Sequence, residues 1–141
     1  MAGLILAYAR EIDLGDGVPS EAEERKQLNG WLEGIKSTLE YTAPGDFVAL
    51  KYSGAGPRTL GLLETMPPAK PTPELAQALE EICDLAAKKG VGLLMDAEHV
   101  SVQQGIHEWT LDLMRKYNKS SGGKAVVFNT YQMYALPTLL L

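Results

Sequence analysis

Three short apolar runs in this sequence each end in a polar residue that could take part in chemistry. They are FVAL before Lys51, VGLLM before Asp96 and AVVF before Asn129. Buried parallel strands are almost wholly apolar, and in α/β folds their carboxyl ends face the ligand. A cation, an anion and an amide that point toward one such end could bind a small zwitterion or a polar cofactor ring. The sequence therefore predicts a binding or active site built from the ends of three strands.

Simpler roles remain open for these residues. Lys51 and Asp96 could form a structural ion pair between neighbouring strands. Glu98 could cap the helix that follows it, because a carboxylate is favoured near the positive end of a helix. Asp96, Glu98 and His99 suggest a metal site. Adjacent strand residues point to opposite faces, however, so these three side chains do not converge and we predict no metal.

Other reactive residue types have weaker patterns. Gly54-Ala55-Gly56 follows a strand but lacks the spacing of a dinucleotide-binding turn. Ser101 has a histidine nearby but no nucleophile-elbow sequence. Cys83 lies within a helical pattern and is expected to be a buried apolar residue. We expect Tyr131 and Tyr134 to be packing residues.

The elements that would position these residues alternate between strand and helix. Apolar runs predict strands at residues 4–9, 47–51, 91–95 and 125–128. Apolar periodicity predicts helices at residues 20–42, 72–89 and 101–118. The order implies a parallel α/β sheet with right-handed crossovers. Two architectures fit: an open doubly wound sheet, or a partial (β/α)8 barrel of about four β/α units.

Helix ends and loops are marked locally. Ser20, with Glu23 three residues later, forms a capping-box pattern. Thr72 or Pro73 opens the next helix, and Gly90 ends it. The glycine-rich residues 52–60 and the proline-rich stretch that follows are expected to be loops.

The composition excludes several classes of protein. The chain has 141 residues, enough for one domain, and 18 acidic against 13 basic residues give a net charge of -5. A nucleic-acid-binding protein would normally carry a basic stripe, so we expect no nucleic-acid partner. No apolar run reaches the roughly 18 residues that a membrane span needs. The N-terminal segment resembles neither a signal peptide nor a transit peptide.

Four stretches of the chain, in order, resemble the proline dehydrogenase (proline oxidase) family of the fungal and eukaryotic type. They are LILAYAREI, GDFVALKYSGAG, GVGLLMDAEHVSVQQGIHEWTLDLMRKYN and AVVFNTYQMY. The strand ends DAE and NTYQ are the most specific motifs. The resemblance covers nearly all of residues 3–134, with His99 at a position where the family commonly has glutamine.

The resemblance implies both a fold and an activity. Residues 1–134 would form the N-terminal half of a distorted (β/α)8 barrel that binds FAD at the carboxyl ends of its strands. Residues 135–141 would be a divergent apolar tail. The family is a group of oxidoreductases that convert L-proline to 1-pyrroline-5-carboxylate, the first step of proline catabolism to glutamate. It passes the electrons to a membrane quinone, which implies peripheral membrane association, and in eukaryotes it works in mitochondria.

The same resemblance implies roles for individual residues. Lys51 and Asp96 would belong to the catalytic site. Lys51 would help to order the arginines that hold the proline carboxylate, and Asp96 would lie beside the flavin and the substrate. Asn129 and Gln132 would bind the cofactor, with Asn129 touching the flavin ring.

The family's later elements have no counterpart in this sequence. They include an Arg-Val-Lys-Gly segment and a late helix with paired arginines. We therefore expect a truncated protein that is inactive by itself. One alternative is a non-catalytic regulatory or assembly fragment that pairs with itself or with a full-length enzyme, since unpaired sheet edges favour association. Another is an independent α/β binding domain without a link to proline.

Overall fold

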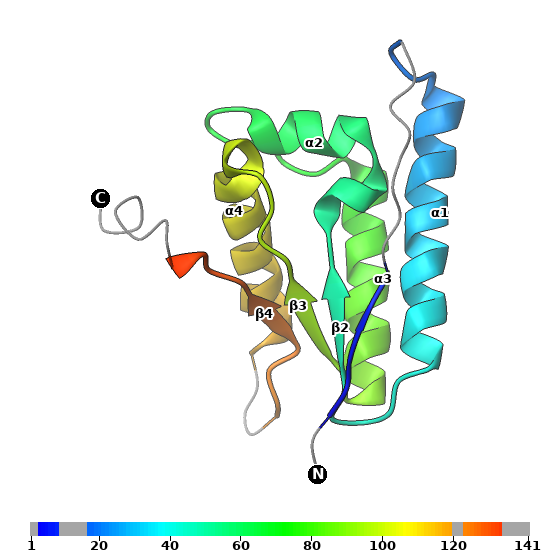
Figure 1. Ribbon diagram of the computed structural model, residues 1–141, viewed down its shortest axis with the longest axis vertical. Coiled ribbons are helices and arrows are strands. Elements are labelled where there is room, and N and C mark those ends of the chain that lie inside the picture. The colour runs from blue at the N-terminus through cyan, green and yellow to red at the C-terminus, as the bar shows by residue number, and fades with distance from the viewer. Residues whose placement is uncertain (1–2, 9–16, 120–122, 134–141) are drawn as a thin grey trace.

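The protein is a parallel α/β sheet with connecting helices. The computed structural model describes residues 3–8, 17–119 and 123–133. Its four strands, in the spatial order β1-β2-β3-β4, are β1 (Ile5–Ala7), β2 (Phe47–Leu50), β3 (Gly92–Met95) and β4 (Val127–Asn129) (Figure 1). The crossover helices are α1 (Glu21–Glu40), α3 (Pro73–Lys89) and α4 (Val100–Tyr117). The predicted alternation of strands and helices is confirmed, and with it the α/β class.

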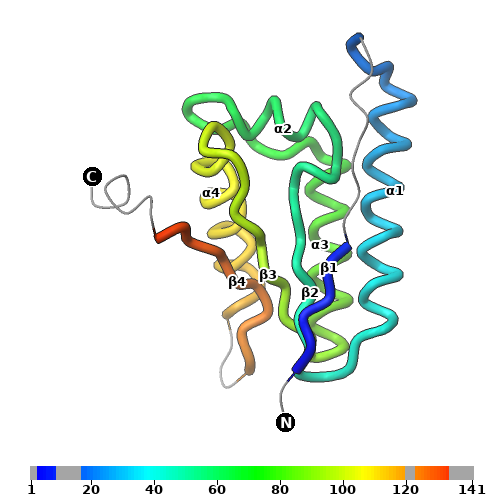
Figure 2. Tube along the Cα trace, viewed as in Figure 1, coloured from blue at the N-terminus to red at the C-terminus, as the bar shows by residue number. Residues whose placement is uncertain are grey.

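The helices cover one face of the sheet and leave the other open. Figures 1 and 2 show α1, α3 and α4 on the same side of the strands. Strand residues on the helical side are buried, namely Val48, Leu50, Leu93, Met95 and Val127. Alternate residues on the open face are only partly buried, namely Phe47, Ala49, Leu94 and Phe128. Sequential strand order with helices on one face fits a barrel segment better than a doubly wound sheet, which has helices on both faces.

Barrel closure stays a prediction. Among the described residues, no strand pairs with the outer side of β1 or of β4. The predicted tail, residues 135–141, lies outside the described part of the chain. None of the described helices is both long enough and apolar enough to cross a bilayer.

The local helix signals are confirmed. Ser20 Oγ accepts a hydrogen bond from Glu23 N at 3.3 Å, and the Glu23 carboxylate accepts one from Ser20 N at 2.8 Å. Thr72 Oγ1 accepts from Leu75 N at 3.2 Å. Gly90 ends α3 with a left-handed φ of 72°. Each of these signals lies within four residues of its partner, which explains why the sequence alone predicted them.

The prediction of a glycine-rich loop at residues 52–60 is wrong. The 3₁₀ helix η1 (Tyr52–Ala55) and the helix α2 (Pro57–Glu64) occupy this region. Gly56 joins them at a φ of 117°, and a Cβ there would lie 2.6 Å from Gln27 Oε1. Pro57 suits the first turn of a helix, where its missing N–H costs nothing. The glycines and the proline therefore form a helix–helix junction.

The strand bounds differ slightly from prediction. β2 ends at Leu50 and β3 at Met95, so Lys51 and Asp96 directly follow their strands. Asn129, predicted to follow its strand, is the last residue of β4. Because side chains alternate along a strand, this difference of one residue turns the Asn129 side chain to the other face of the sheet from Lys51 and Asp96.

Candidate functional site

The side chains of Lys51 and Asp96 leave neighbouring strands at the same end of the sheet. Asp96 N donates to Leu50 O at 2.9 Å, which continues the β2–β3 ladder beyond the pairing of Leu50 with Met95. Lys51 is itself extended, with φ -112° and ψ 121°. Because side chains alternate along a strand, the side chains of both residues point to the face that the helices leave open. Lys51 is exposed and Asp96 is half-buried.

The two charges do not neutralise each other. Within the described residues, no ion pair joins Lys51 to Asp96. The structural ion pair considered from the sequence is therefore absent, although the two residues do follow neighbouring strands. A cation and an anion remain available to a ligand on the open face.

The backbone at Lys51 is held by a buried tryptophan of α1. Trp31 Nε1 donates to Lys51 O at 3.0 Å, and Gly54 N donates to the same oxygen at 3.2 Å. A Cβ on Gly54 would lie 2.6 Å from Trp31 Cδ1, so only glycine lets the indole approach this closely. Gly54 therefore has a packing role, which accounts for the glycine-rich turn without a bound phosphate.

Glu98 links the two loops that carry the charged residues. Its carboxylate accepts from Ser53 N at 3.2 Å, at the start of η1, and its own N–H donates to Gln103 Oε1 at 2.8 Å. The expectation that Glu98 caps α4 is wrong, because the His99 side chain accepts from Ser101 N at that position. In the parts of the chain that the structure describes, no three His, Cys, Asp or Glu side chains are arranged to hold a metal ion.

Asn129 points to the opposite side, toward α4. Its Nδ2 lies 2.8 Å from His107 Nδ1, and its Oδ1 accepts from Thr130 N at 3.0 Å. As the last residue of β4, Asn129 is paired with Met95, so alternation turns it to the helical face. The expectation that all three strand-end side chains point to one mouth therefore holds for Lys51 and Asp96 and fails for Asn129.

The sequence reasoning missed His107. Its ring stacks on Tyr131, with 5.0 Å between centroids and an interplanar angle of 18°. Partial burial lowers the pKa of His107. A neutral ring can accept the Asn129 N–H at Nδ1. Gln132 is half-buried close by in sequence, and Tyr131 is half exposed. No short-range pattern signals this cluster, because His107 and Asn129 lie on different elements.

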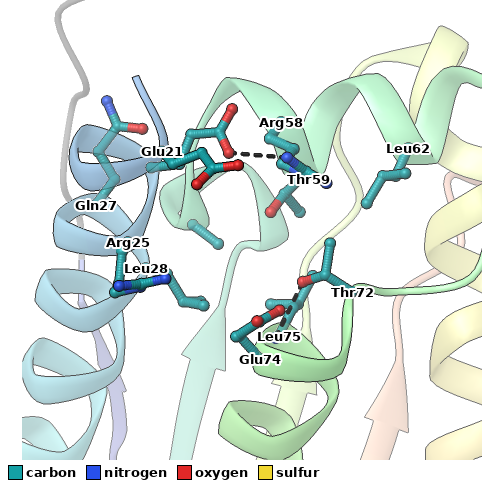
Figure 3. Close-up of a pocket in the computed structure, with 12 residues that line it drawn as sticks. Glu21, Arg25, Gln27, Leu28, Arg58, Thr59, Leu62, Thr72, Glu74 and Leu75 are labelled. Carbon is teal, nitrogen blue, oxygen red and sulfur yellow. Dashed lines mark hydrogen bonds and ion pairs between the residues drawn. The ribbon is translucent and has the colours of Figure 1, made fainter. Parts of the chain in front are cut away.

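A separate cavity of about 250 Å³ lies between α1, α2 and the start of α3 (Figure 3). Its wall carries the ion pair of Arg58 with Glu24 at 3.0 Å. Its lining includes none of the four predicted site residues. We therefore assign the candidate site by the strand ends rather than by this cavity.

Cys83 is fully buried in α3. Burial raises the pKa of its thiol to about 12. The thiol therefore stays protonated and unreactive near neutral pH, as expected for a buried apolar residue.

Comparison with known proteins decides the family. The model of the family described as proline dehydrogenase matches residues 7–139. The chain belongs to the proline dehydrogenase family. A protein named probable proline dehydrogenase, mitochondrial, from Schizosaccharomyces pombe is 46% identical over 39% of this chain and 11% of its own length. Proline dehydrogenase 1, mitochondrial, is 41% identical in Caenorhabditis elegans, over 42% of this chain and 9% of that protein.

The Dictyostelium discoideum protein of the same name is 33% identical over 67% of this chain and 16% of its own length. This member of the proline dehydrogenase family thus matches less than a fifth of these relatives' lengths. No solved structure matches the chain.

Proposed function

We propose that this chain supplies part of the active site of an FAD-dependent proline dehydrogenase that converts L-proline to 1-pyrroline-5-carboxylate. The observation that carries the proposal is a pair of opposite charges, Lys51 and Asp96, at neighbouring strand ends of a chain in this family. Neither charge forms an ion pair within the described residues. Proline is a zwitterion with a carboxylate and a secondary ammonium. A cation and an anion on one surface match those two groups.

The residues fit distinct roles toward substrate and cofactor. The Lys51 ammonium would attract the proline carboxylate, directly or by ordering other cations around it. The Asp96 carboxylate would attract the positively charged ring nitrogen of proline. FAD, when bound, would accept a hydride from the carbon beside that nitrogen. Asn129 and Gln132 are our proposed cofactor contacts. Asn129 keeps one N–H and one lone pair free after its bonds to His107 and Thr130, but its side chain lies on the helical face and not beside Lys51 and Asp96.

The cellular setting follows the named relatives. Their names place them in mitochondria, and we propose the same location for the protein to which this chain belongs. We also propose that this protein passes its electrons to a quinone and associates peripherally with a membrane. We propose no activity for the 141 residues by themselves, since Lys51 and Asp96 lie on an open face where water weakens electrostatic stabilisation.

A chimaera tests the proposal. In the Schizosaccharomyces pombe relative, the segment that corresponds to residues 45–134 of this chain is replaced by those residues, and proline-dependent dye reduction is measured with added FAD. We expect turnover, and a loss of about 100-fold or more with Asp96→Ala, because that charge faces the reacting centre. We expect a smaller loss with Lys51→Ala, mainly as a higher KM for proline.

Controls separate chemistry from folding. Lys88→Ala removes an exposed charge near the end of α3, away from the carboxyl ends of the strands, and should leave the rate unchanged. The isolated chain serves as a further control and should show no proline-dependent reduction. Equal rates for Asp96→Ala and Lys88→Ala in the chimaera would refute the assignment.

A second candidate function is a non-catalytic assembly fragment. The observation that favours it is the unpaired outer side of β1, where the chain offers backbone groups to another strand.

A further inference from the structure

The outer side of β1 carries free backbone hydrogen-bonding groups. Phe47 N donates to Leu4 O at 2.8 Å, and Phe47 is paired with Ile5. In a parallel ladder, alternate residues point to opposite sides, so the N–H and C=O groups of Ile5 and Ala7 point away from β2. Neither residue has a hydrogen-bond partner among the residues that the structure describes.

The side chains around this edge are apolar. Leu4 and Ile5 are 65% and 63% exposed. Residues 3–8 contain no charge and no proline. Edge strands are normally protected by charges, proline or a covering segment, and an unprotected apolar edge is a template for another strand.

The opposite edge is closed at Val127. Asn118 Nδ2 donates to Val127 O at 2.8 Å, and Asn118 Oδ1 accepts from Val127 N at 3.0 Å. These are the outward groups of Val127, because Leu93 N bonds to Val126 O on the inner side, and by the same alternation the other outward position of β4 is Asn129. The side-chain amide thus takes the place that the backbone of a further strand would need. Strand addition is therefore directed to β1.

We propose that β1 pairs with β1 of a second copy of this chain, antiparallel, about a two-fold axis through Leu6. Ile5 would pair with Ala7 of the second copy, and Ala7 with Ile5 of the second copy. Each such pair exchanges both N–H···O=C bonds in an antiparallel ladder. A two-fold interface uses the same patch on both copies, and pairing β1 with β1 consumes the open edge of each. Because Asn118 occupies the outward groups of Val127, β4 lacks the two consecutive outward positions that β1 offers, and we expect assembly to stop at the dimer.

The affinity follows from the size of the contact. A ladder over three residues is small beside the roughly 1,200 Å² that stable interfaces bury. The exposed Leu4 and Ile5 side chains add apolar area. We therefore expect a dissociation constant in the range of about 10 µM to 300 µM. The dimer concerns only the edge of the sheet and does not depend on the proposed proline chemistry.

Sedimentation equilibrium of the 141-residue chain, without proline or FAD, tests the proposal. The apparent mass should rise from 15.3 kDa toward twice that value as the concentration rises. Ala7→Pro removes an outward N–H that β2 does not use, and proline is tolerated at such edge positions. Ile5→Lys brings like charges together across the axis. Both variants should stay monomeric, whereas Val18→Lys, at a 95% exposed position away from the edge, should dimerise like the parent chain.

Amide hydrogen exchange provides a second readout that needs no variant. The Ile5 and Ala7 amides should gain protection as the parent chain is concentrated. A parent chain that stays monomeric up to about 1 mM, above the expected range of dissociation constants, would overturn the proposal. So would dimerisation of both edge variants with the parent affinity, open-ended polymers, or unchanged protection at Ile5 and Ala7.

Discussion

The two edges of the sheet are made of similar short apolar strands but end in opposite ways. At β4, the Asn118 side chain satisfies the outward N–H and C=O of Val127. At β1, the outward groups of Ile5 and Ala7 have no partner among the described residues. Strand sequence alone therefore does not decide whether an edge is open. A single amide from a neighbouring loop decides it, because it imitates one residue of the next strand.

The same contrast extends to the attachment of each strand. β4 is connected to α4 through Asn129 and His107, in addition to Asn118. On the β1 side, the Asp46 carboxylate accepts from Leu4 N at 2.9 Å and from Ala43 N at 2.8 Å. One edge strand is thus fixed by two side-chain contacts to the helical layer, and the other by a carboxylate at one end. This difference predicts which strand responds to which perturbation.

Replacing Asn118 with alanine should give the largest effect. Val127 is fully buried, and Val126 N also bonds to Asn118 Oδ1 at 2.8 Å. Buried backbone groups left without partners cost about 1–3 kcal/mol, so we expect Asn118→Ala to lower the free energy of unfolding by about 2 kcal/mol. Urea denaturation measures it. The matched variant Asn29→Ala, on the exposed side of α1, should change stability by less than about 0.5 kcal/mol.

The Asn118 variant also tests the comparison of the edges. With β4 uncapped, Ala7→Pro should no longer keep the chain monomeric, because a second open edge becomes available. If the double variant Asn118→Ala/Ala7→Pro stays monomeric while folded, Asn118 does not protect the edge.

Acidification should weaken the attachment of β1 to the sheet before that of β4. Hydrogen bonds from the Ala43 and Leu4 N–H groups lower the pKa of Asp46. A carboxyl group with a depressed pKa in the folded state contributes stability above its unfolded pKa, near 3.8, and loses it as the pH falls through the folded value. The protection factor of the Leu4 amide should therefore fall below about pH 4, and Asp46→Asn should remove that dependence. Asp112→Asn removes another carboxylate of lowered pKa, one bound to Lys70, and should leave the Leu4 response intact.

Much of the fold could be predicted because its signals are local. Ser20 with Glu23, Thr72 and Gly90 each act within one turn of a helix. Apolar runs located every strand, since a buried parallel strand has few polar residues. The helix α2 was missed because Gly56 and Pro57, which form its junction with η1, are typical of loops when read alone.

The candidate site could be predicted only in part. Lys51 and Asp96 were placed together because strand order and length fix their position. Asn129 was not, because one residue of difference at a strand end reverses the face of a side chain. The capping of β4 by Asn118 depends on how the loop after α4 folds back onto the strand, and no periodicity or motif encodes that approach.

The smallest effect should come from His107, the second contact between β4 and α4. Burial lowers the pKa of His107 from an ordinary value of 6.5. Below that value the unfolded chain binds more protons than the folded chain, so stability should fall as the pH drops from about 7 toward the folded pKa. Urea denaturation between pH 5 and 8 measures this slope, which His107→Gln should remove.

Asn129→Ala gives a second control. Asn129 Nδ2 can only donate to His107 Nδ1, and a protonated ring cannot accept that hydrogen bond, so its loss should raise the pKa of His107 toward the ordinary value and shrink the pH-dependent window. A parent chain and an Asn129→Ala variant with the same flat profile would mean that His107 does not couple β4 to α4. The edges of the sheet would then differ only through Asn118. Removing that side-chain amide should leave β4 as open as β1.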